Sequence, residues 1–200
     1  MFLGIDCSGV TAELALLVPD GREWIAREDT PRQADVIFPL LEKIMADAAI
    51  TKNDITAIGA ITGPGSFTGI RVGLALAQGL ADGLGIPAFG IDAFAAVRGE
   101  RREARGEIIV LESKRAELYV WHDNKTEMLT PEQIRQLAGN NKTVVHNLAE
   151  NIFVSPLASR LSPLAAAAAR HAQMMHAKNT PGEILAPYYL RDADAKPNAA

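Results

Sequence analysis

The chain has 200 residues, of which 48% are hydrophobic and 22% are charged, and its formal net charge is −4. This composition is typical of a globular protein with a sizeable core, and the acidic balance gives no reason to expect direct nucleic acid binding. A single cysteine excludes an internal disulfide framework and a multi-cysteine zinc centre. No apolar run approaches the about 20 residues of a membrane span, and the opening MFLGIDCSGV lacks the basic region of a signal peptide. We therefore expect a cytoplasmic protein without a membrane segment.

The first half of the chain alternates between short aliphatic runs and segments with helical spacing. Pro19-Asp20-Gly21 marks a tight turn between two runs, so the opening runs are expected to pair as antiparallel strands. Thr30, Pro31 and Gln33 have the pattern of a helix start, and Pro39 should kink that helix or delay its beginning. The predicted elements are strands at 2–6, 11–18, 22–27, 57–62 and 88–91, and helices at 32–48, 68–84 and 93–98, the last capped by Asp92.

The second half resembles a reduced variant of the first. Thr130-Pro131-Glu132-Gln133 starts a short helix, and Ser162 with Pro163 precedes an alanine-rich helix. The predicted elements are strands at 107–113, 117–122 and 143–146, helices from 130 and from 164 to about 176, and a turn at Asn124-Lys125.

The order of these elements predicts the fold. Three antiparallel strands followed by strands that alternate with helices are typical of a ribonuclease-H-like layer, in which the later strands pair in parallel. The charged stretch 99–106 indicates a boundary. We therefore predict an α/β protein with an N-terminal ribonuclease-H-like lobe at 1–98, a smaller C-terminal lobe at 107–190 and a loose tail at 191–200.

The segment 63–73, GPGSFTGIRVG, is the most informative in the chain. A glycine-rich turn from strand to helix can offer backbone amides to a phosphate. However, Ile70-Arg71 stand where a P-loop needs lysine and a hydroxyl residue, no dinucleotide fingerprint occurs, and Ser66 lacks the flanks of a nucleophile elbow. The other interpretation is that these glycines allow a tight turn and close helix packing.

The helix that follows is apolar nearly all round. Its polar residues Arg71, Gln78 and Asp82 form one narrow stripe, and its glycines each cost up to about 1 kcal/mol relative to alanine. Close helix–helix approach would compensate for them, and the helix at 32–48 also spreads its apolar residues widely. We therefore predict a partner-binding surface on these two helices, the alternative being burial under the second half of the same chain. The predicted interface residues are Ile37, Phe38, Leu41, Met45, Gly69, Ile70, Gly73, Leu74, Ala77 and Leu80.

The remaining candidate residues give weaker signals. Asp6 and Ser8, in a short turn between two strands, form a candidate nucleotide site in which Asp6 would face a metal ion. Cys7 is expected to be a small, half-buried core thiol rather than a nucleophile. The four histidines show no metal-ligand spacing, and the charged residues at 98–105 and at Lys114-Arg115 are expected to be solvated. We predict no catalytic residue, no metal centre and no cofactor.

Several of these segments resemble the bacterial TsaB (YeaZ) family. The resemblance is specific in GPGSFTGIRVG and its continuation LALAQGLADGLG, and it extends to FLGIDCSGVTAELALL, ESKRAELYVWHD and the PYYLRDADA ending. Cys7 stands where the family usually has threonine, and Glu112, Ser113, Lys114 and Ala116 depart from the family's D-A-R-x-G-E pattern, whereas Arg115, Glu117 and Tyr119 keep it.

The resemblance implies an actin-like ATPase (ASKHA) fold of two lobes without independent catalysis. It also implies a partner subunit for TsaD, which transfers threonylcarbamoyl to adenosine 37 of ANN-decoding tRNAs, with TsaE as a further partner. The same two N-terminal helices would form a homodimer as a four-helix bundle, and tRNA would be met only indirectly. The rival prediction is an ATP-dependent phosphotransferase of the actin and sugar-kinase class that uses Asp6 and the 63–69 turn.

Overall fold

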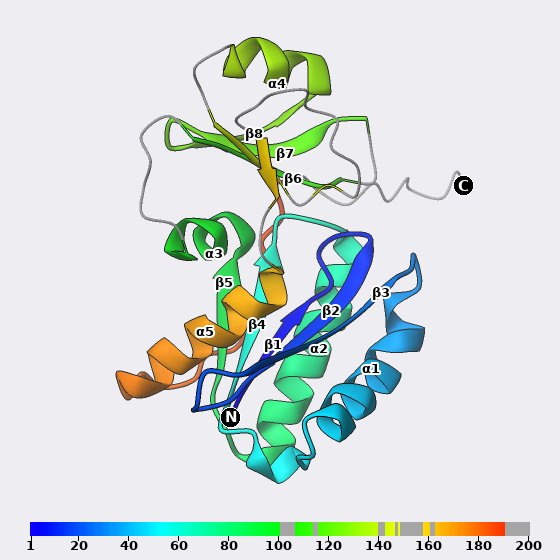
Figure 1. Cartoon of the computed structure of the whole chain (residues 1–200), viewed down its shortest axis with the longest axis vertical. Coiled ribbons are helices and arrows are strands. Elements are labelled where there is room, and N and C mark those ends of the chain that lie inside the picture. The colour runs from blue at the N-terminus through cyan, green and yellow to red at the C-terminus, as the bar shows by residue number, and fades with distance from the viewer. Residues whose placement is uncertain are drawn as a thin grey trace, which may run out of the picture.

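The first lobe is a five-stranded sheet with helices on both faces (Figure 1). In a computed structural model of the chain, the described residues are 1–100, 107–113, 116–139, 143–146, 148, 158–160 and 163–190. The sheet order is β3-β2-β1-β4-β5, antiparallel from β3 to β1 and parallel from β1 to β5. The elements are β1 (Phe2–Asp6), β2 (Thr11–Leu17), β3 (Glu23–Asp29), α1 (Gln33–Asp47), the short 3₁₀ turn η1 (Lys52–Asp54), β4 (Ala57–Gly63), α2 (Phe67–Leu84), β5 (Ala88–Asp92) and α3 (Ala93–Glu100).

The second lobe repeats this topology with shorter elements. Its sheet has the order β10-β9-β6-β7-β8, again with an antiparallel part from β6 to β8 and parallel pairs between β6, β9 and β10. The predicted fold class, two α/β lobes of which the second is reduced, is confirmed. The elements are β6 (Ile108–Leu111), β7 (Leu118–His122), β8 (Lys125–Leu129), α4 (Pro131–Ala138), β9 (Val144–His146), β10 (Ala158–Arg160) and α5 (Leu164–Ala177).

Helix α5 returns from the second lobe and packs on the first sheet, against β1, β4 and β2 (Figure 1). Its alanines lie directly on sheet glycines, because a Cβ at Gly4 would be 1.8 Å from the Ala165 carbonyl oxygen and one at Gly59 would be 1.9 Å from that of Ala168. Residues 107–190 therefore do not form one C-terminal lobe. That expectation followed chain order, whereas the chain leaves the second lobe before α5 begins.

A shared apolar core joins the two lobes. Phe94 of α3, Ile109 and Leu111 of β6, and Leu164 and Ala168 of α5 belong to one buried cluster. The Arg98 guanidinium also lies over the Trp121 ring of β7, 4.6 Å from its centre. The second lobe is thus packed onto the first through α3 and the start of α5.

Most predicted element boundaries agree with the structure, with a few corrections. Helix α1 starts at Gln33 rather than after Thr30, because the buried Gln33 side chain donates to the Gly9 carbonyl at 3.0 Å instead of capping its own helix. The helix also continues through Pro39. Strands β8 and β10 were not predicted, because each is short and lacks a clear apolar run. The caps at Asp92 and Thr130 are confirmed by bonds from Ala95 N–H and Gln133 N–H.

Some predicted features fall outside this description. The charged boundary at 101–106, Lys114-Arg115, Ser162 and the tail at 191–200 lie outside the described residues. Within the part of the chain that is described, none of the helices combines the length and apolarity that a bilayer crossing requires.

Candidate functional site

The glycine-rich turn and the start of α2 pack directly on the turn between β1 and β2. The Ser66 amide donates to the Ser8 carbonyl at 2.6 Å, and the Ser66 hydroxyl caps α2 by accepting from Gly69 N–H at 3.3 Å. A Cβ at Gly65 would lie 2.2 Å from the Ser8 carbonyl oxygen, and one at Gly69 would lie 2.1 Å from that of Cys7. These glycines therefore allow close packing of two backbone segments, which was one of the two interpretations of the motif.

Asp6 and Ser8, the residues of the candidate nucleotide site, lie together in this turn and are hydrogen-bonded to each other. The Asp6 carboxylate accepts from Ser8 N–H at 2.8 Å, and burial raises the pKa of Asp6 above its ordinary value. From the second lobe, the Tyr119 hydroxyl donates to the Gly65 carbonyl at 3.1 Å. The Asp6 carboxylate, the Ser66 amide and the Gly65 carbonyl are thus paired within the chain.

The described residues of this turn form neither a metal-binding cluster nor a reactive thiol. Among the described residues, His, Cys, Asp and Glu side chains nowhere gather in threes in a way that could hold a metal ion. Cys7 is buried, and desolvation followed by the nearby Asp6 charge raises the pKa of its thiol. A thiol that stays protonated is a poor nucleophile, so Cys7 is a small core residue, as predicted.

Most of the predicted interface residues face the interior of the first lobe. A Cβ at Gly73, for example, would lie 3.5 Å from Cys7 Cβ and from Ile5 Cγ2, so this glycine points at β1. Of the predicted set, only Phe38 is exposed, with 60% of its surface accessible, and Met45 and Leu80 are partly buried. The residues that the structure corrects to core positions are Ile37, Leu41, Gly69, Ile70, Gly73, Leu74 and Ala77.

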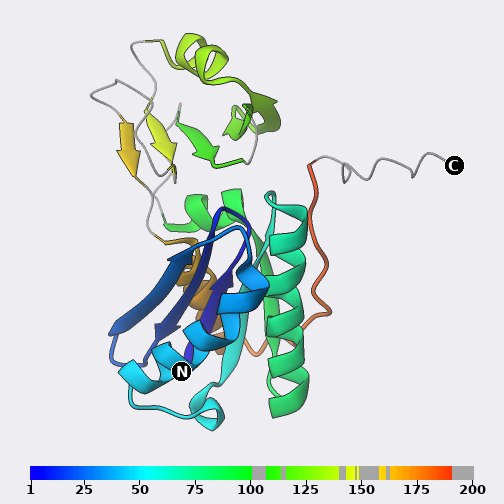
Figure 2. The ribbon, with the colours of Figure 1, turned by 90° about the vertical axis from the view of Figure 1, so that its right-hand side faces the viewer.

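An exposed ridge of small residues remains on the outer side of α2. Ala75, Gly79 and Gly83 are exposed at helical spacing, and a Cβ at Gly79 or Gly83 would meet nothing within 4 Å. Nothing within the described chain therefore compensates for the lost helix propensity of these two glycines, which is about 1 kcal/mol each. Helix α1 lies beside α2 and carries the exposed Phe38, so the two helices together present what we call the outer helix face (Figure 2).

The segment 183–190, which we call the strap, covers the other flank of α2 (Figure 2). The Tyr189 ring stacks on Phe67 with centroids 4.8 Å apart, and its hydroxyl accepts from Arg71 Nε at 3.0 Å. The Tyr188 amide donates to the Thr62 carbonyl at 2.8 Å, and the Glu183 amide donates to that of Ala88 at 3.0 Å. The alternative of burial under the second half of the chain is therefore correct for this flank. The aromatic run PYYLR was the available signal.

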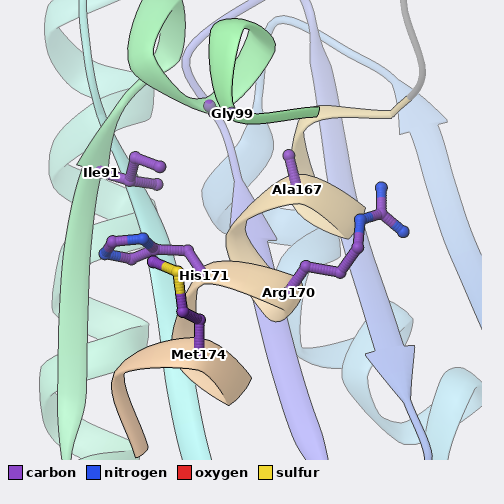
Figure 3. A pocket seen from close by; sticks show the side chains of 7 residues that line it. Ile91, Gly99, Ala167, Arg170, His171 and Met174 are labelled. Atoms are coloured by element: carbon purple, nitrogen blue, oxygen red, sulfur yellow. The ribbon is translucent and has the colours of Figure 1, made fainter. Parts of the chain in front are cut away.

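A separate cavity of about 390 Å³ lies between α3, β5 and α5 (Figure 3). His171 is half-buried there, and desolvation lowers the pKa of its imidazole, which favours the neutral ring. None of the predicted interface or nucleotide-site residues contributes to this cavity. Its lining consists of Ile91, Ala96, Gly99, Ala167, Arg170, His171 and Met174.

Comparison with known proteins agrees with the resemblance in the sequence. A protein named tRNA threonylcarbamoyladenosine biosynthesis protein TsaB, from Escherichia coli, is 35% identical over 140 residues, which cover 61% of this chain and 59% of that protein. A Haemophilus influenzae protein of the same name is 31% identical over 120 residues, 58% of this chain and 51% of its own length. The chain thus matches between half and three fifths of the length of these relatives.

Solved structures confirm the fold. YeaZ from Pseudomonas aeruginosa aligns with a TM-score of 0.66 at 22% identity, covering 94% of this chain and 98% of that one. A second Pseudomonas aeruginosa structure, described as an uncharacterized protein with similarity to peptidase YEAZ, has a TM-score of 0.68 at the same coverage. Residues 31–160 match the model of the family described as TsaD, tRNA N6-adenosine threonylcarbamoyltransferase. The chain therefore belongs to this family, and proteins named TsaB are among its relatives.

Proposed function

We propose that this chain is a non-catalytic partner subunit in the formation of threonylcarbamoyladenosine at position 37 of ANN-decoding tRNAs. In this role it binds TsaD through the outer helix face and holds it in a competent arrangement. The names of its relatives support the pathway, and the family match supports the kinship with TsaD. The protein acts in the cytoplasm and meets tRNA only through the assembly.

The observation that carries this proposal is the uncovered glycine ridge on α2. Gly79 and Gly83 are exposed in a helix interior with open space around them, and the neighbouring helix α1 carries an exposed Phe38. Small residues allow another helix to approach closely, and an exposed aromatic side chain on the adjacent helix offers a large apolar contact. A helical partner laid across the outer helix face would therefore bury both features together.

Kinship between the two subunits supports the geometry of the complex. If TsaD shares the fold of this chain, it has helices equivalent to α1 and α2, and two related subunits can pair by packing these helices into a four-helix bundle. A second copy of this chain can use the same face, so the homodimer and the TsaD complex exclude each other. TsaE then joins the TsaD complex at another surface.

The rival function, an ATP-dependent phosphotransferase, receives less support from the turn at Asp6. The Asp6 carboxylate is buried and accepts a hydrogen bond from Ser8 N–H. The space beside the neighbouring Gly65 and Gly69 is occupied by backbone of the same lobe. Calorimetric titration of the isolated chain with ATP and magnesium separates the two proposals. Micromolar binding would favour the phosphotransferase, whereas the partner-subunit proposal expects none.

The proposal is tested by filling the ridge without disturbing the fold. In Gly79→Leu the new side chain points into open space, so the protein should fold as the wild type does. We expect its Kd for TsaD in calorimetric titration to rise at least about tenfold, or about 1.4 kcal/mol. Gly73→Leu would not serve, because that position contacts Ile5 and Cys7 in the core.

A matched control carries the same side chain elsewhere. Lys125→Leu places leucine at an exposed position in the second lobe and should leave TsaD binding unchanged. Wild-type affinity of a folded Gly79→Leu protein, or equal losses in both variants, would show that the outer helix face is not the binding surface.

A further inference from the structure

Two buried carboxylates lie under the start of α5. Asp6 of β1 stands directly opposite Glu13 of β2, and the two residues are only 8% and 7% exposed. Gly4, two residues before Asp6 on β1, faces the Ala165 carbonyl, so the pair lies on the α5 side of the sheet. Burial, followed by the charge of Asp6, raises the pKa of Glu13 to about 7.

Glu13 caps the first turn of α5 from a distant strand. Pro163 stands at the N-cap position and provides no side-chain hydrogen bond to the first amides of the helix, which need acceptors from outside the helix. Instead, the Glu13 carboxylate accepts from Ala165 N–H at 3.1 Å, across 152 residues of sequence. A carboxyl oxygen at this position also interacts favourably with the helix dipole.

The capped turn is also part of the junction between the lobes. Leu164, Ala167 and Ala168 of α5 pack in one cluster with Ile109 and Leu111 of the second lobe. A change in the position of the first α5 turn therefore reaches the second lobe directly, because well-packed side chains transmit displacements.

We propose that Glu13 and Asp6 form a proton-dependent cap that fixes the first turn of α5, and with it the junction of the lobes, to the first sheet. When the pair holds one proton, one oxygen accepts from Ala165 N–H without repulsion between the two side chains. When both carboxylates are ionised, two negative charges share a site that holds little water. The first turn of α5 then loosens, and water enters the site.

The charged and titratable groups around Glu13 determine the pH at which the cap loses its proton. Arg27 stands opposite Glu13 on β3 and favours its ionised form, whereas Asp6 and the protonated Cys7 thiol come from β1 and the residue after it. Ser8 donates to Asp6, and α5 contributes the Ala165 amide. Desolvation and the Asp6 charge outweigh the Ala165 amide and Arg27, which both favour the ionised form, so the cap changes its charge near neutral pH rather than in acid.

Hydrogen exchange of the whole chain tests the proposal. The measured quantity is the exchange rate of the Ala165–Ala169 amides in the wild type divided by that in Glu13→Gln, a ratio that cancels the intrinsic effect of pH. We expect a ratio near unity at about pH 5.5 and at least about tenfold faster exchange in the wild type at about pH 8.5. A ratio that does not change with pH overturns the proposal.

Two further measurements keep the test independent of one variant. Glu28→Gln alters an exposed carboxylate on β3 and should show the wild-type pH response; loss of that response in Glu28→Gln would also overturn the proposal. In the wild type, the carbon-13 signal of the Glu13 carboxyl should titrate near pH 7 together with the Ala165 amide. A titration near 4.5, or an Ala165 amide that does not respond, contradicts the cap.

Discussion

The two faces of the first sheet are built in opposite ways. On one face, alanines of α5 lie on Gly4 and Gly59 so closely that a single added carbon would meet backbone oxygen at 1.8 or 1.9 Å. On the other face, α1 and α2 pack through bulky aliphatic residues such as Ile37, Ile70 and Leu74, and the outward ridge of α2 has open space at Gly79.

This difference separates two uses of glycine. Glycines under α5 let a helix approach a sheet and are fully used within the chain, whereas the glycines of the α2 ridge meet no atom of it. The glycine contacts on the α5 face are therefore closed within the chain, whereas the glycine ridge of the outer helix face is open. Substituting alanine for one glycine on each side should therefore give the largest difference in stability.

Gly59→Ala should cause the largest loss of stability. Its Cβ would lie 1.9 Å from the Ala168 carbonyl oxygen, and α5 must move to make room, so we expect a loss of about 3 kcal/mol or more in urea unfolding. Gly79→Ala, the matched change on the ridge, should instead stabilise the chain by up to about 1 kcal/mol. Equal effects of the two substitutions would contradict the contrast between the faces.

The buried carboxylates on the α5 face should make stability fall as the pH rises from 4.5 to about 7. An acid whose pKa is raised from 4.5 to about 7 binds more protons in the folded state, so its contribution to stability declines between these values. At about 1.4 kcal/mol per pKa unit, the decline from Glu13 is about 3 kcal/mol. Chemical unfolding in steps across this window measures it, and Glu13→Gln should flatten the curve; an unaltered slope in that variant would argue against a buried proton on Glu13.

A smaller effect is expected at the strap on the α2 flank. Tyr189→Ala removes the stacking on Phe67 and the hydrogen bond from Arg71, so it should cost about 1 kcal/mol and speed cleavage of residues 183–190 by added protease. Tyr189→Phe keeps the stacking and should lie between this variant and the wild type. If both variants resist protease as the wild type does, the strap is held by its backbone bonds instead.

The sequence predicted the layers of this fold because their signals are local. Aliphatic runs, the turn at Pro19-Asp20-Gly21 and the glycine-rich turn each act over a few residues, and the repeated order of strands and helices then determines the ribonuclease-H-like topology. The caps at Asp92 and Thr130 are equally local and were also predicted.

Contacts that bridge distant parts of the chain could not be predicted in the same way. Helix α2 is apolar on nearly every side, and periodicity does not tell whether Gly73 faces the sheet or a partner. The structure decides this, because a Cβ at Gly73 would lie 3.5 Å from Cys7 Cβ. The strap has no periodic pattern, and the cap of α5 comes from Glu13, 152 residues away. For the same reason, helix content at 164–177 was predictable, whereas its place in the first lobe was not.

Protection of a thiol placed on the ridge tests the central proposal most directly. The only native cysteine, Cys7, is buried, so in Gly79→Cys the new thiol is the one a maleimide reagent can reach. We expect rapid labelling of the dilute free chain and at least about tenfold slower labelling with saturating TsaD, while Ile25→Cys, on the exposed part of β3, reacts equally fast in both. Labelling of Gly79→Cys at the same rate with TsaD bound would contradict docking on the outer helix face.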